Sequence, residues 1–283
     1  MTISDSDSIR DHQTNDTSDL VISALGIIGT GKSSLLNAIA GEHVFETGNG
    51  SATTQSVSGE IRQWKSAPAI KSVRLIDTPG LCDCSAHDKE TVHEMARYFK
   101  SVANGVTAFV LVFSIHDIRL DAYTQSMLDL FRVLLGKDFW NYVIIVFTHV
   151  EDDEKDELEA NIEAVLDPEV LPRCLSDSLL LLKRTDGFVA QICDIYKLSR
   201  RTFVPNIVFV STLNPRTSSY TKKCMRQLYQ AVNDCHIRNH NKQFTSKWLT
   251  QIIHMPEDRK ANFITESIRE AWSSLTSNKC QIQ

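Results

Sequence analysis

Residues 26–33 read Gly-Ile-Ile-Gly-Thr-Gly-Lys-Ser, a complete G-x-x-x-x-G-K-[ST] motif. An apolar run at residues 20–25 precedes the motif, and a helix-like stretch at residues 34–40 follows it. A strand, a glycine-rich loop and a helix in this order present backbone N–H groups and the positive end of the helix dipole to an anion. A chance glycine-rich turn is the alternative, and the register of all three parts argues against it. We therefore expect a phosphate-binding loop here.

The residue types in this loop predict specific roles. Lys32 is expected to contact the β- and γ-phosphates of a nucleotide, and Ser33 to bind Mg²⁺ through its hydroxyl. The residues expected around the phosphates are Gly26, Gly29, Thr30, Gly31, Lys32, Ser33 and Ser34.

A second motif lies downstream, where the strand-like residues 73–76 run into Asp77-Thr78-Pro79-Gly80. This is the D-x-x-G pattern of nucleotide-switch proteins. Asp77 is expected to hold the Mg²⁺ shell, and the N–H of Gly80 to meet the γ-phosphate. Taken alone, the tetrapeptide is an ordinary turn. Its position after a buried strand favours the phosphate interpretation.

The composition limits the classes of protein to which this chain can belong. The chain has 283 residues, 42% of them apolar, which is enough for one large α/β domain with appendages. A net charge of −5 gives no argument for a nucleic-acid partner, and we expect none. Seven scattered cysteines are typical of reduced thiols and predict a cytoplasmic protein. Cys82, Cys84 and His87 could hold zinc, but solvent-facing switch residues are the simpler interpretation.

Apolar runs at residues 21–25, 73–76, 108–113, 143–147 and 207–210 predict strands buried on both faces, with amphipathic helices between them. Residues 57–64 predict an antiparallel edge strand. We expect an α/β, three-layer P-loop fold with a mostly parallel six-stranded sheet. Residues 1–19 read as a disordered leader, 20–236 as the nucleotide domain and 237–283 as a C-terminal helical extension. The two helices of this extension either pack on the domain or form a partner or membrane interface. Residues 166–203 read as an insertion.

The base-reading segment should follow the fifth strand, where the chain reads Phe-Thr-His-Val-Glu-Asp at residues 147–152. A carboxylate there accepts hydrogen bonds from the guanine N1–H and amino group, which adenine lacks. Glu151 stands where an Asp is usual, so an adenine-specific ATPase stays open as an alternative. Asn214, after the sixth strand, is a further candidate for base contact.

Residues 20 to about 235 resemble the AIG-type, immunity-associated GTPases (the GIMAP or IAN family) and the related Toc GTPases of the chloroplast outer envelope. The matching segments are residues 26–37, 76–82, 108–113 and 143–152. The resemblance implies a G domain that binds GTP or GDP with Mg²⁺ and forms a homodimer or oligomer through its nucleotide face. It also implies that Thr148 and His149 belong to the base segment, and that a switch threonine closes over the γ-phosphate. Thr53 is the first choice for that threonine, and Thr54 is nearly equal.

Lys32, Thr53 and Gly80 are therefore the residues expected to support hydrolysis, and Ser33, Thr53 and Asp77 those expected at the metal. Efficient small GTPases place Gln after the D-x-x-G glycine, and this chain has Leu81. We therefore expect slow intrinsic hydrolysis of GTP. The alternative is a nucleotide-binding scaffold with negligible turnover.

The last four residues, Cys280-Gln281-Ile282-Gln283, fit a loose C-a-a-X lipidation pattern. Lipidation of Cys280 would place the protein peripherally on the cytosolic face of a membrane. An ordinary chain end with a chance cysteine is the alternative.

Overall fold

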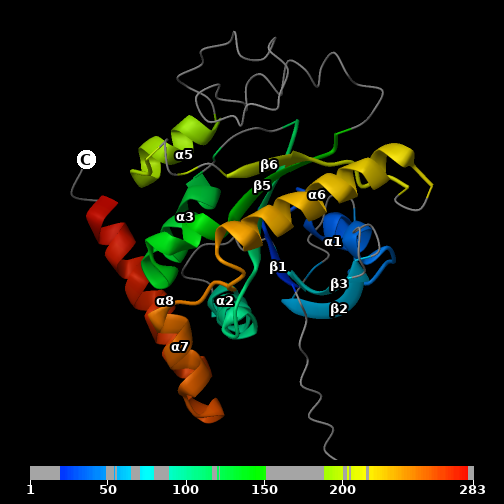
Figure 1. Cartoon of the computed structure of the whole chain (residues 1–283). Coiled ribbons are helices and arrows are strands. Elements are labelled where there is room, and N and C mark those ends of the chain that lie inside the picture. Colours follow the sequence, from blue (N-terminus) through cyan, green and yellow to red (C-terminus); the bar gives the residue numbers. More distant parts are fainter. Residues whose placement is uncertain are drawn as a thin grey trace, which may run out of the picture.

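The computed structural model describes residues 20–48, 54, 56–64, 71–79, 89–116, 120, 122–150, 188–199, 203, 205–214 and 217–279. Its centre is a six-stranded sheet in the order β2-β3-β1-β4-β5-β6 (Figure 1). β2 pairs with β3 antiparallel, and the other neighbouring strands are parallel. The strands are β1 (Leu20–Leu25), β2 (Ser58–Trp64), β3 (Lys71–Asp77), β4 (Ala108–Ser114), β5 (Val143–Thr148) and β6 (Asn206–Phe209). The predicted sheet, including its antiparallel edge strand, is confirmed.

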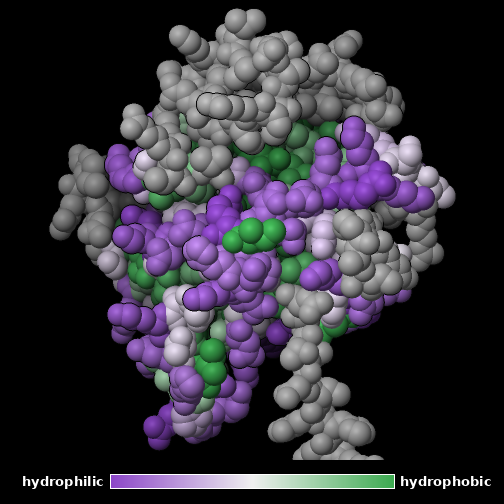
Figure 2. Space-filling model, viewed as in Figure 1, coloured by the Kyte–Doolittle hydropathy of each residue, from purple (hydrophilic) through white to green (hydrophobic). Residues whose placement is uncertain are grey.

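Helices cover both faces of the sheet and make the three expected layers. They are α1 (Lys32–Ala40), α2 (Lys89–Val102), α3 (Ala122–Leu135), the 3₁₀ helix η1 (Lys137–Tyr142), α5 (Phe188–Tyr196), α6 (Ser219–Arg238), α7 (Lys247–His254) and α8 (Glu257–Lys279). α1 and α6 pack on one face, and α2, α3 and α5 pack on the other (Figure 1). α6 turns its apolar side to the sheet, so its outward side is largely hydrophilic (Figure 2).

The strands are continuous apolar runs because both of their faces are buried. Side chains alternate along β1, so that Ile22 packs under α1 while Val21 and Leu25 pack under α2 and α3. Ser23 is the polar exception in this strand, and its hydroxyl hydrogen-bonds the buried Tyr98 hydroxyl of α2 at 3.0 Å. Because both faces are covered, the carboxyl ends of the strands form a fixed edge for the loops that follow.

α7 and α8 pack on the domain, one of the two arrangements that the sequence left open. Leu249, Ile252, Ile264 and Ile268 are buried in the core that α2 and α3 share. An exposed ion pair between Lys100 and Glu257, 2.7 Å between nitrogen and oxygen, also joins α2 to α8. Within the described part of the chain, no helix combines the length and apolar character needed to cross a membrane.

Several sequence predictions fall outside the described residues. They concern the leader, the cysteine–histidine group at residues 82–87, most of the 166–203 segment and Cys280. The end of the 166–203 segment is described, and it contains helix α5. The boundary drawn at residue 236 falls inside α6, which continues to Arg238.

Replacing Phe99 with Ala should destabilise the whole domain. Its ring centroid lies 5.3 Å from that of Phe131 on α3 and 5.0 Å from that of Trp248 on α7, so one cavity would disturb three helices. We expect the free energy of unfolding to fall by about 3–5 kcal/mol, measured by urea denaturation. Val133→Ala on α3 is the control, because Val133 is 47% exposed. A Phe99→Ala loss as small as that of the control would contradict this account of the core.

Candidate functional site

The loop between β1 and α1 runs close against the end of β4. A Cβ atom added to Gly26 would lie 2.4 Å from the carbonyl oxygen of Val112, closer than any real contact allows. Gly29 and Gly31 both have φ of +82°, a left-handed conformation that side chains other than glycine rarely adopt. The glycines of the motif are therefore required by packing at Gly26 and by backbone conformation at Gly29 and Gly31.

Side chains within the loop fix its shape. The carbonyl of Ile27 accepts hydrogen bonds from the Thr30 hydroxyl at 3.0 Å and from Lys32 Nζ at 2.8 Å. The Lys32 side chain is buried and folds back over the loop. Gly31, the N-cap of α1, has no side chain to cap the helix, so an anion is the natural partner for the helix amino end.

Three oxygen atoms converge beside the start of α1. Ser33 Oγ donates to Asp77 Oδ2 at 2.7 Å, Thr54 Oγ1 donates to the same oxygen at 3.2 Å, and the two hydroxyls are 3.1 Å apart. Mg²⁺ prefers oxygen ligands in octahedral geometry at 2.0–2.1 Å, which separates neighbouring ligand oxygens by about 2.9 Å. The three oxygens therefore fit Mg²⁺ both in kind and in spacing.

Asp77 is fully buried at the end of β3. Burial raises the pKa of its carboxyl, while the hydrogen bond from Ser33, the charge of Lys32 and the hydrogen bonds from Thr54 and Thr78 oppose this effect. The adjacent Thr78 hydroxyl donates to the carbonyl of Ala24 in β1 at 2.8 Å. The carboxylate is thus held in place by contacts with α1 and by the strand next to it.

Thr148, predicted in the base segment, lies beneath the phosphate loop. Its hydroxyl contacts the carbonyl of Thr30 at 2.6 Å and that of Phe113 at 3.1 Å, and the residue is buried. A Cβ on Gly31 would meet the same hydroxyl at 3.4 Å. Thr148 therefore ties the loop to the ends of β4 and β5.

His149 and Asn214 stand at the carboxyl ends of β5 and β6, and both are exposed with positive φ of 60° and 47°. The His149 ring lies 3.2 Å from Ser114 Oγ, measured at Nδ1, and its centroid is 6.2 Å from that of His116 at an interplanar angle of 30°. These residues therefore lie at the same end of the sheet as the loop between β1 and α1. His116 carried no sequence signal that marked it for this place.

A contact between the entry to β2 and α2 was also not predictable from the sequence. Glu94 Oε2 accepts from the backbone N–H of Val57 at 3.0 Å, and Arg97 donates to the other carboxylate oxygen at 2.7 Å. Because Val57 follows Thr54 by three residues, this contact links the oxygen cluster to α2. Nothing in the local sequence around Glu94 indicates a distant backbone partner.

Three predicted site residues, Thr53, Gly80 and Glu151, lie outside the described residues. Thr54, the alternative to Thr53, is described and stands in the oxygen cluster. The remaining loop residue, Ser34, is half-buried in the first turn of α1.

Gly26→Ala should cost stability through its clash with Val112, by about 1–3 kcal/mol, because a backbone carbonyl cannot move aside as a flexible side chain does. Gly29→Ala is the matched control. A Cβ there meets nothing within 4 Å, so only the strain of positive φ remains. Urea denaturation of both variants measures the difference. A Gly26→Ala variant as stable as the parent would show that the contact with β4 does not constrain the loop.

Thr148→Val should weaken GTP and ATP binding by the same factor, because the change releases the carbonyl of Thr30 and disturbs the loop under any nucleotide. Thr148→Ser keeps the hydroxyl and should bind nearly as the parent does. Competition against a fluorescent nucleotide measures both affinities. A loss confined to GTP would instead assign Thr148 to reading the base.

Residues 20–179 match the AIG1 family. The immune-associated nucleotide-binding protein 12 of Arabidopsis thaliana is 32% identical over 170 residues, which cover 59% of this chain and 42% of that protein. The chain thus spans less than half the length of this relative.

Solved structures share the fold at low identity. Toc33 from Arabidopsis thaliana in complex with GDP and Mg²⁺ has a TM-score of 0.50 at 18% identity, covering 82% of this chain and 89% of its own. A second structure concerns the chloroplast translocon components atToc33 and psToc159, for whose GTPase activity dimerization is important. It has a TM-score of 0.51 at 19% identity, and the match covers 76% of this chain and 82% of that chain. The family match covers more than half of the chain, and with the phosphate loop in place the conclusion is direct: this protein belongs to the AIG1 family.

Proposed function

We propose that this protein binds GTP and GDP with Mg²⁺, hydrolyses GTP slowly, and acts as a switch by associating with a second copy of itself in the GTP state. The convergence of Ser33, Thr54 and Asp77 oxygens beside the phosphate loop carries the proposal. A loop alone accounts for phosphate binding. The adjoining oxygen cluster supports a metal site beside that loop, as the terminal phosphates of a bound nucleotide require.

Each side chain has a defined task in this proposal. Lys32 exchanges its bond to the Ile27 carbonyl for the β- and γ-phosphate oxygens. Ser33, Thr54 and Asp77 hold the Mg²⁺, which supplies positive charge to the phosphates when it is bound. The uncapped amino end of α1 faces the same anion.

Base selection rests on the carboxyl ends of β5 and β6. The exposed His149 ring offers a flat surface for a purine, and Asn214 stands on the neighbouring strand end. Glu151 is the residue we propose to accept from the guanine N1–H and amino group. It replaces the usual Asp, so ATP binding is the alternative that the experiment below must address.

Slow turnover follows from Leu81, because a leucine side chain cannot orient the attacking water. A second subunit can supply the missing group, and an arginine provided in this way accelerates hydrolysis by about 10³–10⁵ in known systems. Dimerization is important for the GTPase activity of atToc33 and psToc159, and this supports the proposed role of a second subunit. Placement at a cytosolic membrane face, expected from the sequence, stays a prediction.

Single-turnover phosphate release from GTP, measured across a wide range of protein concentrations, tests the proposal. We expect a low rate that rises with protein concentration, because two copies must meet to complete the site. Lys32→Ala should bind no GTP and give no release, and Lys247→Ala, an exposed lysine at the start of α7, should behave as the parent does.

Two other results would point to different functions. A negligible rate at every concentration, with GTP still bound, would support a nucleotide-binding scaffold without turnover. ATP that displaces a bound fluorescent guanine nucleotide as well as GTP does would support an ATPase. Undiminished GTP affinity in Lys32→Ala would refute the phosphate site itself.

A further inference from the structure

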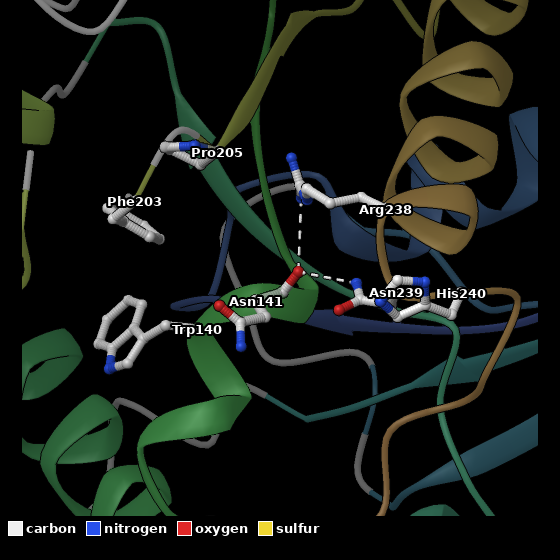
Figure 3. A pocket seen from close by; sticks show the side chains of 7 residues that line it. All are labelled: Trp140, Asn141, Phe203, Pro205, Arg238, Asn239 and His240. Atoms are coloured by element: carbon white, nitrogen blue, oxygen red, sulfur yellow. Dashed lines mark hydrogen bonds between the residues drawn. The ribbon is translucent and has the colours of Figure 1, made fainter. Parts of the chain in front are cut away.

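Side chains that bond to distant backbone groups fasten the chain at opposite edges of the sheet. At the edge where β5 begins, beside the pocket of Figure 3, the carbonyl of Asn141 accepts from Asn239 Nδ2 at 3.0 Å and from Arg238 Nη2 at 3.4 Å. These bonds join η1 to the end of α6. At the edge where β3 ends, Glu94 Oε2 accepts from the backbone N–H of Val57 at 3.0 Å. Val57 lies in no helix or strand, so this second contact fixes a segment between elements.

The Glu94 carboxylate is itself held in one orientation. Its side chain is 15% exposed, and its other oxygen accepts from Arg97 Nη1 at 2.7 Å, one helical turn further along α2. On the inward side of α2, Met95 and Tyr98 are fully buried in the core. Hydrogen bonds to an ionised carboxylate are stronger than those between neutral groups. α2 thus presents a fixed acceptor to the backbone of Val57.

The contact lies next to the end of the sheet ladder. β2 begins at Ser58, which pairs with Asp77 at the end of β3, and Val57 comes just before it. The ladder fixes the chain from Ser58 onward, and Glu94 fixes it one residue earlier. Three residues span at most about 11 Å, so a chain held at Val57 keeps Thr54 within that reach. The Thr54 hydroxyl lies 3.2 Å from Asp77 Oδ2.

The position of Thr54 decides whether the oxygen cluster is complete. Ser33 and Asp77 belong to α1 and β3, whereas Thr54 lies in the segment before β2. A residue outside helices and strands loses conformational entropy when it becomes a ligand, unless other contacts have already ordered it. The hydrogen bond from Val57 to Glu94 supplies such order before a metal binds.

We propose that Glu94 is a positioning residue for the Mg²⁺ site. It touches neither the metal nor the nucleotide. It holds the segment at Val57, and this keeps the Thr54 hydroxyl in the oxygen cluster. The inference rests on the proposed function, because it assumes that the oxygen cluster binds Mg²⁺. It assigns a role at that site to a residue of α2, a helix outside the phosphate-binding motifs.

Binding of a fluorescent, non-hydrolysable GTP analogue, titrated with Mg²⁺, tests the inference on the full chain. We expect the affinity of the parent to rise with Mg²⁺. Glu94→Ala should raise the Mg²⁺ concentration at the midpoint of this rise roughly tenfold, the effect of one lost charge-assisted hydrogen bond, and leave the affinity in EDTA unchanged. Glu94→Gln retains an acceptor oxygen and should recover most of the loss. Glu270→Ala, which removes an exposed carboxylate from α8, is the control.

The same titration in a Thr54→Val background shows whether Glu94 acts through Thr54. Thr54→Val removes the hydroxyl that reaches Asp77, so adding Glu94→Ala should shift the midpoint by no more than about twofold. Val57→Pro removes the N–H donor, leaves Glu94 in place and should reproduce the shift of Glu94→Ala. Proline is tolerated at the entry to an edge strand, and β2 is one.

The inference is overturned if Glu94→Ala and Glu270→Ala have the same midpoint, or if Glu94→Ala causes its full shift in the Thr54→Val background as well. In both cases the parent would still bind the analogue more tightly with Mg²⁺, so the proposed metal site would stand. A parent whose affinity does not change with Mg²⁺ would overturn the metal site and this inference together. Urea denaturation checks the fold of each variant, and Val57→Pro provides the same test if Glu94→Ala does not fold.

Discussion

The packing of the phosphate loop against the ends of the parallel strands is the constraint on which the rest of the site depends. Gly26 lies so close to the Val112 carbonyl that no other residue fits there. Thr148 holds the loop from below through the carbonyl of Thr30. Both contacts come from neighbouring strands that are buried on each face. The loop is therefore held in place by the rigid sheet. A loop held in this way needs little reorganisation when it meets an anion.

Much of the fold was predictable because its signals are local. Apolar runs marked the strands at residues 108–113 and 143–147, and the glycine motif marked the loop between β1 and α1. Asp77 was predictable for the same reason, since it ends a strand within a recognisable tetrapeptide. In each case the residues that determine the feature are adjacent in the sequence, and a pattern of spacing is enough to find them.

The unpredicted features depend on residues far apart in the sequence. The role of Thr148 as a support for the loop requires that β5 end beside Thr30, which lies 118 residues earlier. Glu94 contacts the backbone of Val57 from a helix, and its side chain looks like any surface carboxylate in the sequence. His116 joined His149 only because β4 and β5 are neighbours. Sheet order and register decide such contacts, and the sequence determines them only through the complete fold.

The same rigidity bears on how a response to nucleotide could cross the domain. β5 runs through the middle of the core, and all six of its residues are buried. Coupling between two sites requires an element with two arrangements that each ligand biases differently. A strand packed on both faces and paired with β4 and β6 is a poor candidate for such an element. The contact of Glu94 with Val57 is a better one, because it joins the segment that carries Thr54 to a helix and leaves β5 unchanged. Any response to nucleotide should therefore spread from the segment that carries Thr54 to α2.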